Sequence, residues 1–326
     1  MTAHALLVPD CGSGIGLGHL ERMLALADAL RPDVVASVVI PEGFEPLRTR
    51  VTGRGHAIVE AVGPTVARAE SAARDTVHDV IVLDGYVFGV DAQRRLRALA
   101  PLIVVDDLGL PNASDIAVNP SPGGERKRPD GAGAFLGGAR YALVSRAIVD
   151  ARTVVSERGR PPRSVLVSTG SMNLRGISGQ VSAELVARDA TVDVSVVVGP
   201  EMHRDELPDN PRQHVLVAPQ TLADALASST VYAGAAGTTA VQAACVGIPA
   251  VITPAVANQS DQAAALAAAG CAVAAEPEDL AGQCLALLDD PARCDEMARR
   301  GRSLVDGSGA SRVAEALRHL LRVRAA

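Results

Sequence analysis

Short hydrophobic runs alternate with longer amphipathic segments along the first part of the chain. The runs have the length and the Val, Ile and Leu content of buried strands. Amphipathic helical segments follow the first run and Asp84. This alternation predicts βαβ units and therefore a parallel, doubly wound sheet. The runs are ALLVP (5–9), DVVASVVI (33–40), DVIVLD (79–84), LIVVDD (102–107) and DIAVN (115–119).

A second series of the same kind follows a polar segment, 150–164, which contains a Pro-Pro pair. We therefore predict two α/β domains, 1–155 and 156–326, the second ending in a largely helical tail from about residue 277. Two facing domains of this kind would place the carboxyl ends of their strands around a shared cleft. The second series comprises SVLVST (164–169), VDVSVVVG (192–199), HVLVAP (214–219), TVYAG (230–234) and PAVITP (249–254).

The segment 120–141, PSPGGERKRPDGAGAFLGGARY, is the longest one without periodicity. Irregular segments of this length in compact domains are usually functional or disordered. The sequence therefore predicts a mobile loop over the cleft.

Composition narrows the function classes. The net charge is −6 without a basic run, and the chain has no Trp, three Phe and three Tyr, which argues against nucleic-acid binding and an aromatic sugar-binding strip. Five cysteines without C-x-x-C spacing and no H-x-x-x-H pattern indicate reduced thiols and neither a metal nor a cofactor. No apolar segment is long enough to span a bilayer, and no leader pattern is present, so we expect a cytoplasmic protein. Nothing in the pattern indicates an oligomeric state.

The first strand leads into four alternate glycines, Gly12 to Gly18, and then His19. Backbone N–H groups of such a loop at a helix start can hold an anion. The spacing fits neither G-x-G-x-x-G nor the lysine-containing phosphate loop. The helix dipole disfavours a protonated imidazole in the first turn, so His19 is a candidate base, with a surface or capping role as the alternative.

Polar side chains lie at the ends of three of the predicted strands. Asp84 and Tyr86 stand at the end of the strand 79–84, Asp106 and Asp107 at the end of the strand 102–107, and Asp10 at the end of the first strand. Such carboxylates can orient a base or bind a sugar hydroxyl, although Asp is also common in turns. These residues are therefore predicted at one edge of the first sheet.

In the second half, AGAAGTT (233–239) forms another glycine loop before a helix. Thr238 and Thr239 are predicted N-caps, and the loop is a second candidate anion site. Asn258 and Gln259 begin the next helix, where their amides could bind a sugar or a base edge.

The pattern G-x-G-H-x-x-R, at 16–22, resembles the two-domain glycosyltransferase-B superfamily, and more narrowly the UDP-sugar hydrolases of pseudaminic acid biosynthesis and related spore-coat polysaccharide proteins. The resemblance continues in DGY (84–86), VDD (105–107), DIAVNPS (115–121), GGARYAL (137–143), AGAAGTT and NQ (258–259).

This resemblance implies that His19 activates water against the anomeric carbon of a UDP-linked sugar, releasing the free sugar and a nucleoside diphosphate held by the second domain. With the strand-end residues described above, the candidate catalytic residues are His19, Asp10, Asp84 and Tyr86. The candidate binding residues are Gly16, Gly18, Arg22, Asp106, Asp107, Asn119, Tyr141, Thr169, Gly170, Ser171, Gly234, Gly237, Thr238, Thr239, Gln242, Asn258 and Gln259.

The chain departs from the family pattern at several positions. Thr169 replaces a glycine, Met172 lies near an expected acidic residue, and Gln242 replaces the acidic residue expected at the ribose. Ser145 stands where an arginine is expected, with Arg146 next to it. The alternatives to hydrolysis are transfer of the sugar to a hydroxyl acceptor, epimerisation of a nucleotide sugar, and nucleotide-sugar binding without catalysis.

Overall fold

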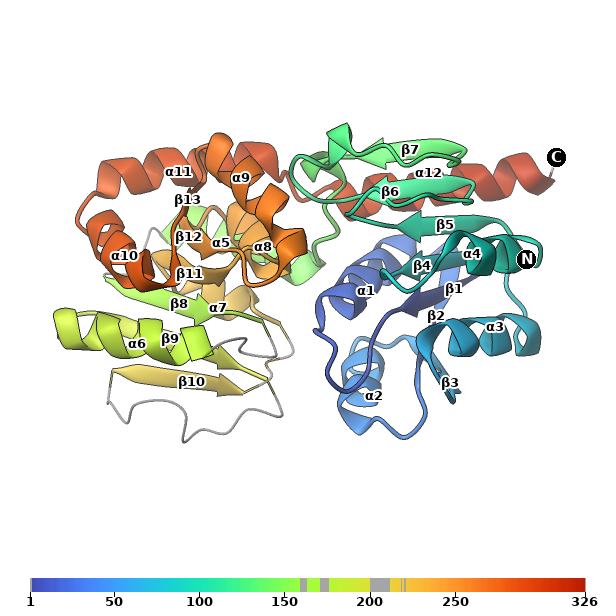
Figure 1. Cartoon of the computed structure of the whole chain (residues 1–326), viewed down its shortest axis with the longest axis horizontal. Helices are drawn as coiled ribbons and strands as arrows, with labels where there is room; N and C mark the ends of the chain where they lie inside the picture. The colour runs from blue at the N-terminus through green and yellow to red at the C-terminus, as the bar shows by residue number, and fades with distance from the viewer. Residues whose placement is uncertain are drawn as a thin grey trace. The chain divides into compact units, whose positions relative to one another are not determined.

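The computed structural model describes residues 2–158, 163–170, 176–199, 212–217, 219 and 221–325. The chain forms two compact units, Met1–Ser145 with Ser308–Ala326, and Arg146–Gly307 (Figure 1). The first unit thus combines the chain up to residue 145 with the last helix. The sequence pattern predicted a boundary at 155, with that helix in the second domain.

The first unit contains a seven-stranded sheet in the order β3-β2-β1-β4-β5-β6-β7, and all of its strand pairs are parallel. The predicted doubly wound sheet is confirmed, and β3 and β7 are additional to the predicted strands. The strands are β1 (Ala3–Pro9), β2 (Val34–Pro41), β3 (Ala57–Ala61), β4 (Val80–Asp84), β5 (Leu102–Val105), β6 (Ile116–Asn119) and β7 (Ala134–Gly137).

Strand β7 lies inside the segment that was predicted to be a mobile loop, and that prediction was wrong. Its residues pair with β6 from Ile116–Ala134 to Asn119–Gly137. Phe135 and Leu136 are partly buried, so the segment closes the edge of the sheet.

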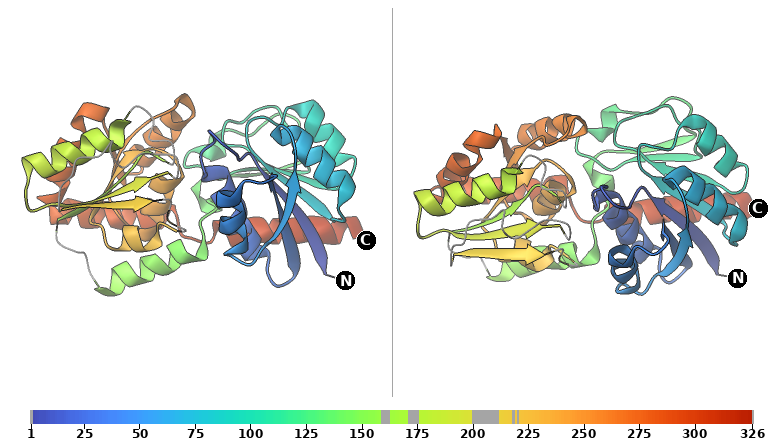
Figure 2. Two further views of the ribbon diagram at one scale, coloured as in Figure 1. Left: turned by 90° about the horizontal axis from the view of Figure 1, so that it is seen from below. Right: turned by 60° about the horizontal axis from the view of Figure 1, so that its bottom comes forward.

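Helices cover both faces of the first sheet (Figure 2). Successive strand residues point to opposite faces, so Leu7 packs in one core with α1 and α12, and Leu6 packs in the other with α3. The helices are α1 (Gly18–Leu30), α2 (Glu45–Thr52), α3 (Thr65–Asp75), α4 (Val90–Arg97) and α12 (Gly309–Ala325).

Helix α12 packs in the first unit through buried apolar side chains and through an arginine that donates to the end of α1. Val313 and Leu317 are fully buried in the core that contains α1. Arg318 donates to the carbonyls of Ala29 and Leu30 at the end of α1, at 3.0 and 3.1 Å. Basic groups near the last carbonyls of a helix are favourable because they satisfy open acceptors and complement the helix dipole.

The second unit contains a six-stranded sheet in the order β10-β9-β8-β11-β12-β13, again with parallel pairs. The strands are β8 (Ser164–Ser168), β9 (Asp193–Val198), β10 (Gln213–Val217), β11 (Val231–Ala235), β12 (Ala250–Thr253) and β13 (Ala272–Ala274). The helices are α5 (Arg146–Arg158), α6 (Ile177–Arg188), α7 (Ala223–Ala227), α8 (Thr238–Val246), α9 (Ser260–Ala268), α10 (Leu280–Leu288) and α11 (Pro291–Leu304).

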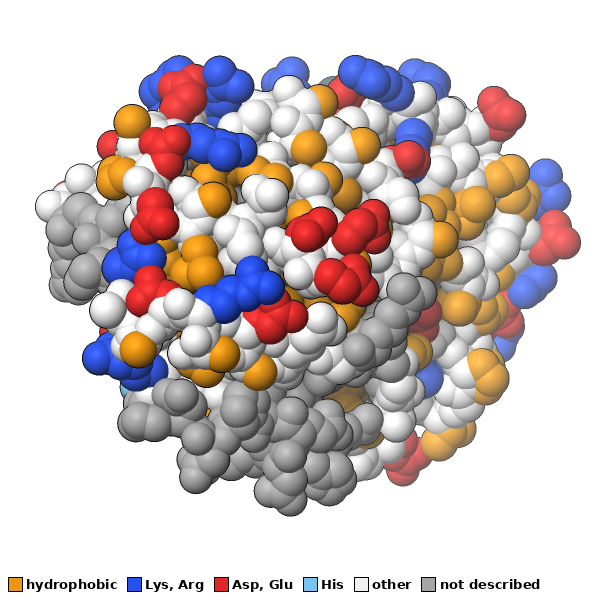
Figure 3. Space-filling view, turned by 60° about the vertical axis from the view of Figure 1, so that its left-hand side comes forward, with side chains coloured by type: hydrophobic (Ala, Val, Ile, Leu, Met, Phe, Trp, Pro, Cys, Tyr) orange, Lys and Arg blue, Asp and Glu red, His pale blue; other side chains and the backbone are white. Residues whose placement is uncertain are grey.

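Charges of both signs are interspersed on the molecular face in Figure 3. Ion pairs within single helices place opposite charges side by side, as Glu296 does with Arg299 and Arg300 on α11. Within the described ranges, no helix combines the length and apolarity needed to cross a membrane, and no group of three or more His, Cys, Asp or Glu could hold a metal ion.

Candidate active site at the carboxyl edge of the first sheet

Three strand ends bring the candidate residues of the first unit together. Pro9 pairs with Asp84, and Asp84 pairs with Val105, so β1, β4 and β5 end at the same level. The N–H of Asp10 donates to the Asp84 carbonyl at 2.7 Å and fixes the exit of β1 beside that of β4. The start of α1 and the loops after β4 and β5 therefore meet at this edge.

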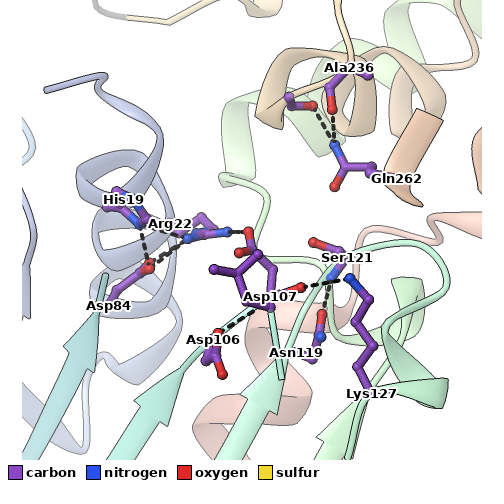
Figure 4. A network of polar contacts seen from close by, with 12 residues as sticks. His19, Arg22, Asp84, Asp106, Asp107, Asn119, Ser121, Lys127, Ala236 and Gln262 are labelled. Carbon is purple, nitrogen blue, oxygen red and sulfur yellow. Dashed lines mark hydrogen bonds and ion pairs between the residues drawn. The ribbon is translucent and has the colours of Figure 1, made fainter. Parts of the chain in front are cut away.

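His19 and Asp84 form a hydrogen-bonded pair at this edge (Figure 4). Nδ1 of His19 lies 2.7 Å from Oδ1 of Asp84, whose side chain is fully buried. A nitrogen lone pair facing a carboxylate oxygen at this distance would be repelled, so the network assigns the proton to Nδ1. In that tautomer the lone pair of His19 is on Nε2, and 14% of this side chain is exposed.

Arg22 lies one helical turn after His19 and joins two carboxylates. It donates through Nε and Nη2 to the two oxygens of Asp84, at 2.9 and 2.6 Å, and through Nη1 to Asp107 at 2.9 Å. Burial lowers the pKa of Arg22, but the charges of Asp84 and Asp107 outweigh it and raise that pKa above its usual range. The guanidinium is thus engaged with protein carboxylates, whereas the sequence pattern predicted a substrate contact.

Tyr86 and Asp107 complete this cluster. The Tyr86 ring meets the His19 ring edge-on, with centroids 5.1 Å apart and planes at 79°. Burial raises the pKa of Asp107, whereas the Arg22 charge and a hydrogen bond from Tyr86 lower it. The lowering effects are larger, so the pKa of Asp107 lies below its ordinary value. Asp107 is therefore ionised at neutral pH.

Asp10 and Asp106 are engaged with loop structure next to the cluster. Asp10 accepts a hydrogen bond from the Thr65 hydroxyl at 2.7 Å. Asp106 accepts from the N–H groups of Leu108 and Leu110 at 2.8 and 2.6 Å, which folds the loop after β5. Burial nevertheless raises the pKa of Asp106. These contacts shape the loops that hold His19 and Asp107.

The glycine loop reaches α1 without a capping side chain among the described residues. Gly12 and Gly14 have positive φ values, whereas Gly16 and Gly18 do not, and Gly18 is the first helical residue. Leu17 occupies the N-cap position and makes no side-chain cap. The first N–H groups of α1 are therefore available to a ligand.

Asn119 and Tyr141 have structural contacts in the first unit. Asn119 is fully buried at the end of β6 and accepts from the Ser121 N–H at 3.2 Å. A Cβ at Gly124 would lie 2.2 Å from the Asn119 Oδ1, so this turn requires glycine. Tyr141 packs against the core around α1, with Arg140 5.2 Å above its ring.

In the second unit, β11 leads through a glycine loop into α8. Tyr232 donates to the carbonyls of Ser168 and Ala235, at 2.7 and 3.0 Å. A Cβ at Gly234 would lie 1.8 Å from the Ser168 oxygen, so the two strand ends touch through glycine. Gly237 occupies the N-cap position of α8, and no side-chain hydrogen bond from the described residues caps this helix.

Thr238 and Thr239 are the first two residues of α8, so their prediction as N-caps was wrong. The glycine loop is held instead by Gln262, whose amide nitrogen donates to the carbonyls of Ala236 and Gly237 at 2.6 and 3.0 Å (Figure 4). Gln259 accepts from the Ala255 N–H at 2.9 Å.

Gln242 lies one turn after Thr238 on the same face of α8. Its side chain is nearly buried, and its Oε1 has no hydrogen-bond partner among the described residues. Buried carbonyl oxygens without a partner are rare, which makes this atom a candidate ligand contact.

Thr169 and Gly170 follow β8. The Thr169 hydroxyl lies 2.8 Å from that of Ser178 on α6. A Cβ at Gly170 would meet open space, although its φ of +90° favours glycine. Ser171 and Met172 lie outside the described residues.

Sequence reasoning missed Arg68, Tyr232, Lys127 and Gln262. Arg68 donates to the Cys11 carbonyl at 2.8 Å and anchors the first glycine loop. Lys127 approaches the Asp107 carbonyl at 3.5 Å. Gln262 lies one helical turn after Asn258, so extending the Asn258–Gln259 motif by one turn would have included it.

Exchange of Gly85 for alanine is expected to destabilise the first unit by about 2 to 4 kcal/mol. Its φ is +154°, and an added Cβ would lie 2.4 Å from the Asp10 Cβ. The free energy of unfolding in urea measures the effect. Gly89→Ala is the matched control, because Gly89 has φ −62° and open space around its Cβ position. Equal stabilities of the two variants would contradict the close contact.

The Asp107 carboxylate is expected to make stability depend on acid pH. Because its pKa is lowered in the folded protein, its contribution is complete above the unfolded pKa of about 4 and is lost as the pH falls through the folded value. Asp107→Asn should therefore be less stable than the native protein at pH 7, and the difference should shrink below about pH 4. Urea unfolding across this range measures it, and a difference that is constant with pH would be contrary to the prediction.

No family model matches the chain. Among curated proteins, it is 21% identical over 213 residues to the uncharacterized protein MJ1062 of Methanocaldococcus jannaschii, an alignment that covers 62% of this chain and 44% of that protein. The chain thus spans less than half the length of this relative.

Solved structures match nearly the whole chain. The spinosyn forosaminyltransferase SpnP has a TM-score of 0.70 at 19% identity, covering 99% of this chain and 100% of that one. The chain has the GT-B fold. The glycosyltransferase SsfS6 of Streptomyces sp. SF2575, complexed with thymidine diphosphate, has a TM-score of 0.66 at 15% identity, covering 97% and 99%.

A putative UDP-N-acetylglucosamine 2-epimerase of Listeria monocytogenes matches with a TM-score of 0.66 at 17% identity, covering 98% and 97%. The fold expected from the glycosyltransferase-B resemblance is thus confirmed. The narrower resemblance to UDP-sugar hydrolases stays a prediction.

Proposed function

We propose that this protein is a glycosyltransferase that moves a sugar from a nucleoside diphosphate to a hydroxyl group of an acceptor. The observation that carries the proposal is the 2.7 Å contact between His19 Nδ1 and Asp84 Oδ1. It leaves the Nε2 lone pair for proton abstraction, as general-base catalysis requires.

The reaction follows from this pair. The acceptor hydroxyl donates to Nε2 of His19 and transfers its proton as its oxygen bonds to the anomeric carbon. The bond between that carbon and the diphosphate oxygen breaks, and its electron pair leaves with the diphosphate. Asp84 accepts the Nδ1–H hydrogen bond throughout and stabilises the imidazolium that forms.

Features of the second unit support a nucleoside diphosphate as the donor's leaving group. The N-terminal N–H groups of α8 have no capping side chain among the described residues, and such groups bind phosphate. The unpartnered Oε1 of Gln242 can accept a hydrogen bond from a ligand hydroxyl or N–H. The fold neighbour SsfS6 was solved with thymidine diphosphate.

Transfer is favoured over hydrolysis because two of the fold neighbours are named as sugar transferases. Hydrolysis is the second candidate, because the same base can deprotonate water and the G-x-G-H-x-x-R pattern resembles that of UDP-sugar hydrolases. Epimerisation is the third, given the putative epimerase among the neighbours.

A panel of nucleotide sugars, each with and without a pool of hydroxyl-bearing acceptors, tests the proposal. Transfer predicts diphosphate release that depends on acceptor, together with an acceptor whose mass has increased by one sugar. Release without acceptor, with free sugar, would replace the proposal by hydrolysis. An isomerised sugar still attached to its nucleotide would replace it by epimerisation, and binding without turnover would leave a nucleotide-sugar binding protein.

A further inference from the structure

Arg22 lies at the centre of the His19 cluster, and its guanidinium is directed at protein groups. Only 10% of its side chain is exposed. Its three described side-chain donations to carboxylates go to both oxygens of Asp84 and to one oxygen of Asp107. A two-point contact between a planar guanidinium and a carboxylate fixes orientation as well as distance.

Arg22 and His19 share one acceptor atom. Oδ1 of Asp84 accepts from Nη2 of Arg22 at 2.6 Å and from Nδ1 of His19 at 2.7 Å, while Oδ2 accepts from Nε of Arg22. The two-point contact therefore determines which way the Asp84 carboxylate faces, and hence where the Nδ1–H acceptor lies. Nη2 itself lies 2.8 Å from Nδ1, and because a guanidinium can only donate, this direct contact favours an unprotonated Nδ1. The Asp84 oxygen that both nitrogens approach opposes it, so any effect of Arg22 that favours Nδ1–H acts through Asp84.

Asp107 holds the other side of the guanidinium. It accepts from Nη1 at 2.9 Å and stands on the loop after β5, whereas Asp84 ends β4 and Arg22 belongs to α1. The cation is therefore balanced by two anions on neighbouring strand ends. With 10% of its side chain exposed and three donations already made to carboxylates, the arginine is poorly suited to bind a substrate phosphate.

We propose that Arg22 is a positioning residue that acts through Asp84 to keep His19 in the Nδ1–H tautomer, with Nε2 as the base, and that it does not contact the substrate. The proposal rests on the proposed function, because it assigns Arg22 a task in the same proton transfer. It differs from that function in predicting a property of the ligand-free protein, the tautomer of one imidazole.

The groups that face His19 come from three places in the first unit. Asp84 approaches from the end of β4, Arg22 from the same helix, and Tyr86 from the loop after β4 with its ring edge. Asp107 acts on the imidazole through Arg22. Of these groups, Asp84 provides the acceptor, and Arg22 fixes the orientation of that acceptor.

The test compares Arg22→Lys with Arg22→Gln. Lysine keeps the charge but cannot span both oxygens of Asp84, and glutamine removes the charge. Arg50→Lys is the matched control, because Arg50 is similarly buried and pairs at 2.5 Å with Glu21, outside the cluster. Nitrogen NMR of histidine-labelled protein, with the His19 signals identified from their loss in His19→Gln, reports the tautomer at a pH where the ring is neutral.

We expect the Nδ1–H form in the native protein and in Arg50→Lys, and a mixture with the Nε2–H form in both Arg22 variants. Where transfer is measured, kcat should fall about 10- to 100-fold in Arg22→Lys with the donor KM unchanged, the size of effect known for groups that orient metal-binding histidines. An Nε2–H ring in the native protein, or a raised KM with an unchanged tautomer and kcat, would overturn the proposal.

If either Arg22 variant does not fold, Asp107→Asn provides the second measurement, because it weakens the hold on the guanidinium at Nη1, together with the Tyr86 hydrogen bond to the same carboxylate, and leaves Asp84 in place. A partial shift of the tautomer supports the proposal, and an unshifted tautomer in this folded variant overturns it. Failure of the proposed function gives a different pattern, in which the tautomer depends on Arg22 although no nucleotide sugar reacts.

Discussion

Exchange of His19 for glutamine is expected to lower the kcat of sugar transfer by about 100- to 10,000-fold, the usual contribution of general-base catalysis. Glutamine is similar in reach but cannot take up a proton at neutral pH. The donor KM should change little, because the candidate nucleotide contacts belong to α8 and its loop. Steady-state rates at saturating donor and acceptor measure both constants.

His56→Gln is the matched control for this experiment. His56 also pairs with a carboxylate: its Nε2 lies 2.7 Å from Oδ1 of Asp28, a residue of α1. This pair is separate from the His19 cluster. Its exchange should leave kcat unchanged. Equal kcat values for His19→Gln and the native protein would exclude His19 as the base.

Exchange of Asp84 for asparagine should destabilise the folded protein by about 3 to 5 kcal/mol, the usual cost of removing one partner from a buried ion pair. The asparagine cannot balance the charge of Arg22, and its amide group can turn a donor toward His19. The transfer rate should fall as well, because the Nδ1–H acceptor is lost or weakened. Urea unfolding measures the stability, and the rate assay is that used for His19→Gln.

Asp91→Asn is the control for a lost ion pair at the surface. Asp91 pairs with Arg94 at 3.2 Å, but both side chains are largely exposed, so the expected change is less than about 1 kcal/mol. A loss in Asp84→Asn no larger than that in Asp91→Asn would show that the Asp84–Arg22 pair does not stabilise the fold.

The alternation of hydrophobic runs predicted both sheets because buried parallel strands have a strong and local sequence signal. It did not predict β7, in which Ala134 is exposed and only Phe135 and Leu136 resemble a strand. It also placed α12 in the wrong unit. An amphipathic helix reveals that it covers a core, and the sequence does not say which one.

The site was predictable as a set of positions, since parallel strands bring His19, Asp84, Tyr86 and Asp107 to one edge. The partners within that set were not predictable. Arg22 was expected to contact substrate, and the helix instead directs it at Asp84 and Asp107. Side-chain direction depends on rotamers and on neighbouring elements that no sequence pattern records.

The bond that breaks in the donor tests the central claim most directly. A donor sugar carrying heavy oxygen between its anomeric carbon and the diphosphate is converted with acceptor, and the products are analysed by mass spectrometry. Attack at the anomeric carbon by a hydroxyl that His19 deprotonates predicts that all of the label stays in the nucleoside diphosphate. Label in a released free sugar, with the nucleoside diphosphate joined to the acceptor, would place the attack at phosphorus and contradict the account.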